Sequence, residues 1–178
     1  MQSKQIPRSF VERGMEFKRH AGIYTFTHEQ LLRSSPKDVW AFFSDPGNLA
    51  KLSPEEIHFR ITSPPQTKAY PGQIITYRIA LFPWARFNWV TEITQVTEER
   101  YFIDEQRFGP YAMWHHEHIF EPHEEGVLMK DKISFKLPLG PLGHLAFRLF
   151  VRKKLLAIFT YRAHTAASLF SQTSSVFD

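Results

Sequence analysis

Five side chains with acid–base or hydrogen-bonding capacity lie close together in this 178-residue sequence. They fall in the segments YFIDEQRFGPYAMWHHEHIF and VLMKDKISFKLP, where a strand facing a protein core usually carries Val or Leu. They are Asp104, Gln106, His116, His118 and Asp131. Two carboxylates beside two imidazoles can exchange protons and satisfy each other's hydrogen bonds. Such a set forms a self-satisfied polar core or the polar wall of a site.

Alternation of side chains across each strand predicts that these residues share one surface. In residues 113–120 both histidines fall on the same face as two large aromatic residues, opposite Glu117. In residues 127–137 Asp131 lies among apolar residues, and three lysines occupy the other face, so we expect Asp131 to point inward. Neighbouring strands would then bring all five side chains to one concave surface. A bulge at the turn between the first two strands would shift this register.

Three interpretations of this surface remain open. A buried carboxylate costs several kcal/mol unless it is paired, so an Asp/His/Gln network in the core is the first. The polar end of a ligand pocket is the second, because pockets are mostly apolar with a few placed polar groups. The third is a metal site, in which His116, His118 and either Asp131 or Asp104 form a set suited to zinc or ferrous iron. We rank the metal last and expect no cofactor.

The same residues are the candidates for catalysis. An Asp–His pair inside an apolar cavity provides the groups for general acid–base chemistry, and the candidates are His116, His118, Asp104 and Asp131. A cyclase, dehydratase or isomerase acting on an aromatic or polyketide-like substrate would use them. We recognise no nucleophile or oxyanion hole, so the sequence does not support a catalytic triad. We therefore favour a ligand-binding protein over an enzyme.

The rest of the chain predicts the elements that position these residues. An alternating strand follows Gly22, and Ser35 and Pro36 suit the start of a short helix. The segment NLAKLSP predicts a second short helix. The sequence then predicts strands at residues 56–64, 73–82, 85–96, 101–108, 113–120 and 127–138, and a last helix from Pro141 to about residue 170. Consecutive strands favour an antiparallel sheet, and only the last helix is long enough to cover its concave face.

This order of elements resembles the START-like, pollen-allergen-like superfamily, also called SRPBCC, and in particular a bacterial subgroup of small proteins without an assigned activity. The matching segments are SSPKDVWAFFSDPGNLAKLSPE, YPGQIITYRI, NWVTEIT, YFIDEQRFGPYAMWHHEHIF and KDKISFKLPLGPLG followed by FTYR. The resemblance implies an α+β helix-grip fold, with a curved antiparallel sheet of about seven strands wrapped on a long C-terminal helix and two short helices after the first strand. The superfamily hosts lipid carriers, hormone receptors, cyclases and hydrolase-like enzymes, so its fold alone assigns no function.

We expect one domain over residues 21–172, between a flexible N-terminal extension (1–20) and a C-terminal tail (173–178). The resemblance implies that a lipid-, polyketide- or aromatic-like molecule binds between the sheet and the last helix. The expected ligand-binding residues are Tyr77, Trp89, Thr91, Asp104, Gln106, Trp114, His116, His118, Phe120, Asp131, Phe159 and Arg162.

Arg162 interrupts an apolar stripe of the last helix, and we expect it to pair with an inward Asp or with a ligand carboxylate. The segment FPW at residues 82–84 and the loop at residues 138–143 are candidate gates of the pocket, although loops rich in Pro and Gly are more often plain turns. The last helix is apolar over a broad surface, which also allows a homodimer, docking of another protein, or a membrane-touching face with Lys153 and Lys154 at its edge.

The composition of the chain excludes several kinds of site and partner. The absence of Cys excludes disulfides and zinc sites with thiolate ligands. The net charge of +4 is mild, and no helix-turn-helix, zinc-finger or RNA-binding signature accompanies the basic N-terminal residues, so we expect no nucleic-acid partner. The most apolar segment, residues 145–161, is interrupted by four basic residues. We therefore expect a soluble, cytoplasmic protein without stable membrane insertion.

Overall fold

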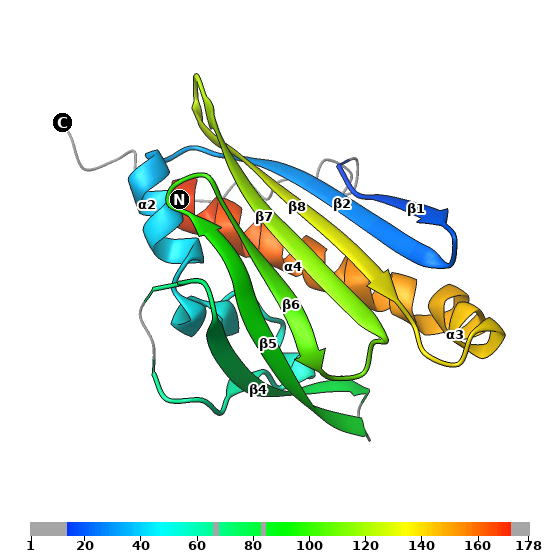
Figure 1. Cartoon of the computed structure of the whole chain (residues 1–178). Helices are drawn as coiled ribbons and strands as arrows, with labels where there is room; N and C mark the ends of the chain where they lie inside the picture. The colour runs from blue at the N-terminus through cyan, green and yellow to red at the C-terminus, as the bar shows by residue number, and fades with distance from the viewer. Residues whose placement is uncertain (1–13, 66–67, 83–84, 172–178) are drawn as a thin grey trace.

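The computed structural model describes residues 14–65, 68–82 and 85–171. An antiparallel sheet of eight strands, in the order β1-β2-β8-β7-β6-β5-β4-β3, curves around one long C-terminal helix (Figure 1). This arrangement confirms the predicted α+β helix-grip fold, with one strand more than expected. None of the helices in the described ranges is both long enough and apolar enough to cross a membrane.

The elements have the following bounds. The strands are β1 (Glu16–His20), β2 (Ile23–Leu32), β3 (Arg60–Ile61), β4 (Gln73–Phe82), β5 (Ala85–Thr97), β6 (Tyr101–Phe108), β7 (Met113–His123) and β8 (Gly126–Lys136). The helices are α2 (Pro36–Phe43), α3 (Pro141–Ala146) and α4 (Arg152–Ser171), with two 3-10 turns, η1 (Pro46–Ala50) and η2 (Glu55–Ile57), and one π-helical turn, η3 (Phe147–Val151). Because α3, η3 and α4 follow one another without a gap, the predicted last helix contains a π turn near its start.

The additional strand is β1, which lies within the segment predicted to be a flexible extension. It pairs with β2, and the ring of Phe17 packs against Phe26 with centroids 4.8 Å apart. Burial of aromatic surface accounts for the order of this short edge strand. The structured part of the chain therefore begins before residue 21, while residues 1–13 lie outside the described ranges.

The connection between α2 and β4 is less regular than predicted. The first short helix is confirmed, and the Ser35 side chain accepts a hydrogen bond from the backbone N–H of Asp38. The second short helix is the 3-10 turn η1, capped by Asp45. The strand predicted at residues 56–64 shrinks to the two residues of β3, because His58 adopts a left-handed conformation with a φ of 43°.

Two apolar clusters form the core, and the polar residues lie between them. On β8, Val127 and Met129 belong to one cluster, while Ile133 and Phe135 belong to the other. Asp131 lies between these two pairs on the same face of the strand and is buried. Strand alternation thus sets a row of charged and polar side chains across the middle of the concave face.

Candidate functional site

A cavity of about 190 Å³ lies between the sheet and α4. Strands β4 to β7 and the last helix each contribute to its wall, and most of the lining side chains are apolar or aromatic. Nine of the twelve predicted ligand-binding residues line it: Tyr77, Trp89, Thr91, Asp104, Trp114, His116, His118, Phe159 and Arg162. The ionisable members of this group lie together, so the cavity has an apolar body and a polar wall.

The other three predicted residues do not line the cavity. Gln106 donates a hydrogen bond to the carbonyl oxygen of Tyr111 (2.7 Å) and accepts one from its N–H (3.2 Å), so it holds the turn between β6 and β7. Phe120 packs in the core against Trp40, with ring centroids 5.6 Å apart. Asp131 is only 2% exposed and contacts both histidines from within the core.

A β-bulge explains why the end of β6 departs from simple alternation. The register between β5 and β6 shifts at Val90/Thr91 and again at Ile93/Gln95. Simple alternation from Asp104 and Gln106 would place Phe108 on the inward face, but Phe108 is 65% exposed. Each extra residue rotates the strand locally, so side chains beyond the bulge leave the concave face.

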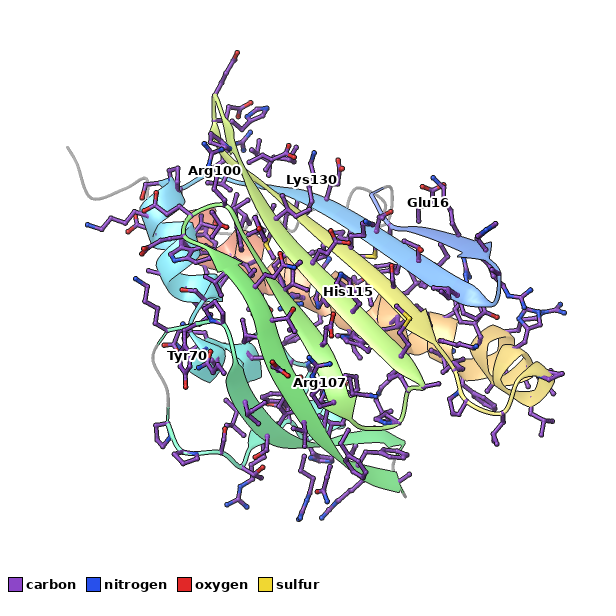
Figure 2. The ribbon with its side chains drawn as sticks, in the orientation of Figure 1. Glu16, Tyr70, Arg100, Arg107, His115 and Lys130 are labelled. Atoms are coloured by element: carbon purple, nitrogen blue, oxygen red, sulfur yellow. The ribbon has the colours of Figure 1, made fainter. Side chains whose placement is uncertain are left out.

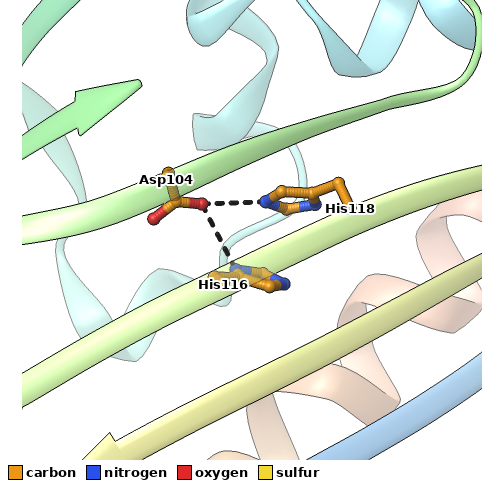
Figure 3. A group of neighbouring side chains, drawn as sticks. All are labelled: Asp104, His116 and His118. Carbon is orange, nitrogen blue, oxygen red and sulfur yellow. Dashed lines mark hydrogen bonds and ion pairs between the residues drawn. The ribbon is translucent and has the colours of Figure 1, made fainter. Parts of the chain in front are cut away.

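The polar wall is a compact network of two carboxylates and two imidazoles, of which Figure 3 shows Asp104, His116 and His118. His116 Nε2 donates to Asp131 Oδ1 at 2.9 Å, and His118 Nε2 donates to Asp104 Oδ2 at 2.9 Å. The second nitrogen of each ring faces the other carboxylate: His116 Nδ1 lies 3.4 Å from Asp104 Oδ2, and His118 Nδ1 lies 3.2 Å from Asp131 Oδ1. The 3.2 Å contact lacks the direction of a hydrogen bond. Each imidazole is therefore held between two carboxylates.

Strand pairing produces this arrangement. Asp104 on β6 is directly opposite His116 on β7, and His118 is directly opposite Asp131 on β8. Directly opposed and diagonal side chains of neighbouring strands lie within contact distance. Alternation along β7 places His115 on the other face of the sheet, where its Nδ1 lies 2.9 Å from a Glu105 carboxylate oxygen (Figure 2).

Two further cationic or potentially cationic groups face Asp131. His28 Nδ1 lies 3.6 Å from Asp131 Oδ2, and Arg162 Nη1 lies 3.9 Å from Asp131 Oδ1. Arg162 also lies over the Phe159 ring, with its guanidinium carbon 5.5 Å from the ring centroid. The buried Nε of Arg162 has no hydrogen-bond partner among the residues that the structure describes. The expectation that Arg162 approaches an inward Asp is thus met.

His28 is a member of the network that the sequence analysis did not assign. In the sequence, Tyr24, Phe26 and His28 alternate on one face of β2, which indicates that His28 points inward like the histidines of β7. The sequence does not indicate which strand pairs with β2. In the structure β2 pairs with β8, and His28 is directly opposite Asp131. This pairing joins residues that are far apart in the chain.

The pKa values of the two histidines shift in opposite directions. Burial and the neighbouring His118 lower the pKa of His116 to about 4, despite the hydrogen bond to Asp131. Burial opposes protonation of His118 as well, but its contacts with Asp104 and Asp131 raise its pKa above the usual 6.5. The network therefore favours a proton on His118 over one on His116.

Both carboxylates remain ionised. Burial opposes the ionisation of Asp131, but the hydrogen bond from His116 and the close contacts with His118 and His28 hold its pKa well below 3.8. Burial acts in the same way on Asp104, and the hydrogen bond from His118 lowers its pKa. The two negative charges face the Arg162 guanidinium and the imidazole of His118, the histidine that holds a proton more readily.

The aromatic side of the cavity carries neutral hydrogen-bonding groups. Tyr77 Oη and Thr91 Oγ1 lie 2.7 Å apart, and Trp89 Nε1 donates to Thr91 Oγ1 at 3.0 Å. Burial raises the pKa of Tyr77 and of Tyr111 well above 10, so both keep their hydroxyl protons. These groups can orient a ligand without adding charge.

The ligand atoms of Asp104, His116 and His118 lie within 4.8 Å of one another, which fits a two-His, one-carboxylate metal site. The third member of this set is Asp104, whereas Asp131 contacts the nitrogen atoms on the far side of the rings. Of the two carboxylates considered for this set, Asp104 is therefore the one placed to share a metal with both histidines. With a metal bound, Asp131 would orient the imidazoles from behind.

The segments that border the cavity are not those considered as gates in the sequence. No residue of the loop at 138–143 lines the cavity within the described part of the chain, whereas residues between Phe42 and Ile61 do. Of the FPW segment, Pro83 and Trp84 lie outside the described ranges. The short turns before β4 therefore border the cavity in place of the proline- and glycine-containing loop.

Comparisons with known proteins identify the fold. No protein-family profile and no curated protein matches the chain. Solved structures do match: TTHA0849 from Thermus thermophilus is 17% identical with a TM-score of 0.64 over 85% of this chain and 99% of that one. The KanY protein is 14% identical (TM-score 0.63, 82% and 95% covered), and Ara h 8.0201 is 16% identical (TM-score 0.57, 83% and 99% covered). At these identities the likeness shows the helix-grip fold and nothing further.

Proposed function

We propose that this protein binds a small, mostly apolar molecule in the cavity between the sheet and α4. The observation that carries this proposal is the cavity itself, whose apolar walls converge on Asp104, His116, His118 and Arg162. A closed hydrophobic core needs no such space, and ligand pockets are apolar with a few placed polar groups. The residues that satisfy one another in the network also form one wall of the cavity.

The walls favour a flat, neutral ligand. Aromatic rings of Tyr77, Trp89, Tyr111, Trp114 and Phe159 surround the space, so an aromatic, polyketide-like or lipid-like molecule fits its chemistry. Because His118 and Arg162 already contact the two carboxylates, a charged ligand group would have to compete with these contacts. We therefore favour an uncharged molecule whose hydroxyl or carbonyl group meets the polar wall.

Placement in the SRPBCC superfamily is part of this proposal. The sequence segments that resemble the superfamily run in the expected order, and solved proteins such as KanY share the fold over most of both chains. The superfamily resemblance favours binding of hydrophobic molecules, and it includes cyclases as well. The fold is compatible with ligand binding and with catalysis, so only the residues of the site can distinguish these two functions.

A specific observation favours acid–base catalysis as the second candidate. His116 and His118 share two carboxylates, yet their pKa values move in opposite directions. A neutral imidazole beside a protonated one offers a general base and a general acid in one wall. A cyclase, dehydratase or isomerase acting on a bound polyketide-like or aromatic substrate would use this pair.

Native mass spectrometry of the gently purified full chain tests the proposal, with the denatured mass as reference. We expect an added organic mass that disappears on denaturation and is reduced in Arg162→Met. A bare chain that also fails to take up a neutral apolar fluorescent probe would overturn the proposal, leaving the network a structural element. An added metal mass lost in His116→Gln and retained in His115→Gln would instead establish the metal site.

Catalysis is separated from binding by incubating the extracted compound with fresh protein. A change in the mass of the compound with wild-type protein, absent in His116→Gln and His118→Gln, would establish an enzyme. His115→Gln provides the matched control, because its side chain lies on the same strand but points away from the cavity. An unchanged compound in all four samples would support a carrier.

A further inference from the structure

The start of the C-terminal helix has two apolar faces. Gly143 and Phe147 are buried toward the sheet, as expected for a helix that is gripped by it. Leu142, Leu145 and Leu149 lie on the opposite side and are 66%, 52% and 56% exposed. Their spacing of three and four residues keeps them in one row along the helix. Large apolar side chains aligned on an exposed helix face indicate a docking surface.

Leu139, which lies shortly before α3, is 75% exposed as well. We call Leu139, Leu142, Leu145 and Leu149 the leucine row. Figure 1 shows α3 at the opposite end of the sheet from α2, where it projects beyond the strands. The row is therefore accessible to a large, flat partner.

The charge of the side chains near the leucine row indicates which kind of partner this surface binds. The chain contains no Asp or Glu between Asp131 and Asp178, yet this segment carries seven Lys and Arg residues. Lys132 pairs with Glu117 on the outer face of the sheet and Arg162 approaches Asp131 at the cavity, which leaves Lys136, Arg148, Arg152, Lys153 and Lys154. Arg148 and Lys153, which lie beside and after the leucine row, are exposed, and no carboxylate of the described ranges forms an ion pair with either.

We propose that the leucine row docks on the surface of a bilayer that contains anionic phospholipids. Exposed leucines enter the boundary between headgroups and acyl chains, while neighbouring cationic side chains meet the phosphates. A second copy of the chain fits this surface poorly, because two such faces would bring uncompensated positive charges together. The proposed contact lies on the membrane and needs no spanning helix. It is independent of what the cavity binds.

Co-sedimentation of the full chain with vesicles tests this docking. We compare vesicles of phosphatidylcholine alone with vesicles that contain about 30% phosphatidylglycerol, at low and at high salt. We expect binding to the anionic vesicles at low salt and its loss at high salt. Leu145→Ser with Leu149→Ser should weaken binding about tenfold or more, and Lys153→Gln about fivefold. Both changes lie on exposed side chains, so the fold should be retained, as circular dichroism would verify.

Two control variants sharpen the test. Ile74→Ser replaces an exposed apolar side chain on β4, and Lys37→Gln replaces an exposed cation on α2. Neither should alter vesicle binding. The proposal is overturned if the wild-type chain ignores anionic vesicles, or if the serine variant of the leucine row binds as well as wild type. It is also overturned if light scattering shows a dimer that the serine variant dissolves while vesicles remain unbound, because a second copy is then the partner.

Discussion

At the scale of single residues, the network depends on Asp131. This carboxylate contacts His116, His118, His28 and Arg162, and all four contacts come from other elements. A buried charge with several partners is stable only while they all remain, because each removed contact leaves desolvation uncompensated. Stability and site geometry are therefore linked through one side chain.

Replacing Asp131 by Asn should lower the free energy of unfolding by about 3–5 kcal/mol, because His118 and Arg162 lose their buried counter-charge. Urea unfolding at neutral pH measures the effect. Glu117→Gln is the matched control: its carboxylate pairs with Lys132 at 2.8 Å on the partly exposed outer face. The control should cost no more than about 1 kcal/mol. Equal losses in the two variants would contradict the assigned importance of the inner network.

Stability should also reach a maximum near the usual histidine pKa of 6.5. Above that pH the folded state keeps the proton of His118, whose pKa is raised, so stability falls as pH rises through its folded value. Between 6.5 and about 4 the unfolded chain binds a proton that the folded His116 refuses, so stability falls as pH decreases. Urea midpoints measured across this range give the profile.

The variant His118→Gln provides the check on that assignment. It should remove most of the decline above pH 6.5, because no proton is then retained by the folded state at this position. A profile with the same alkaline decline in wild type and variant would show that another group produces it. Circular dichroism at each pH would verify that both proteins start from the folded state.

At the scale of elements, close backbone packing fixes the end of the β7–β8 hairpin. Gly126, the first residue of β8, has a φ of 138°, and a Cβ there would lie 2.2 Å from the carbonyl oxygen of Leu32. The hairpin thus rests against the end of β2, whose pairing with β8 brings His28 to Asp131. An element far from the cavity therefore helps to set the register of the polar wall.

Gly126→Ala should therefore destabilise the protein more than Gly22→Ala. Both positions have positive φ, but a Cβ at Gly22, whose φ is 81°, meets nothing within 4 Å. We expect a loss of about 1–2 kcal/mol at Gly22 from backbone strain alone. An additional loss of about 1–3 kcal/mol is expected at Gly126 from the contact with β2. Similar unfolding midpoints for the two variants would argue against tight packing at the hairpin end.

At the scale of the whole molecule, the cavity exists because sheet and helix do not fill the space between the two apolar clusters. Leu155 and Phe159 of α4 are buried against the sheet, whereas Ile158 is partly buried and lines the cavity. The curved sheet and α4 leave this space beside the charged and polar side chains that cross the middle of the concave face (Figure 1). Its position between clusters lets a ligand contact aromatic walls and ionisable groups together.

A larger side chain at Ile158 should fill this space. We expect Ile158→Trp to weaken uptake of the neutral fluorescent probe N-phenylnaphthylamine about tenfold or more, equivalent to about 1.4 kcal/mol. Ala157→Trp is the control, because Ala157 is exposed on the same helix. Fluorescence titration measures both. Equal affinity of the two variants would place the probe outside the cavity.

Much of the fold and part of the site follow from local patterns. Alternation predicts correctly that His116, His118 and Asp131 point inward, because Glu117 lies on the opposite face of β7 and lysines such as Lys132 lie on the opposite face of β8. Helix signals at Ser35 and Pro36 predict α2 for a similar local reason. Such predictions hold because the cause lies within a few residues of the position concerned.

Only the tertiary structure decides which residues meet. The pairing of β2 with β8 adds His28 to the network, and the bulges between β5 and β6 turn Phe108 outward, while Gln106 holds a turn. Contacts between distant segments also explain why β1 forms a strand and why Asp104 is the carboxylate that faces both histidines from the cavity side. Short-range alternation thus determines which way a side chain points, whereas its partners and the space left beside them depend on how the sheet curves and pairs around α4.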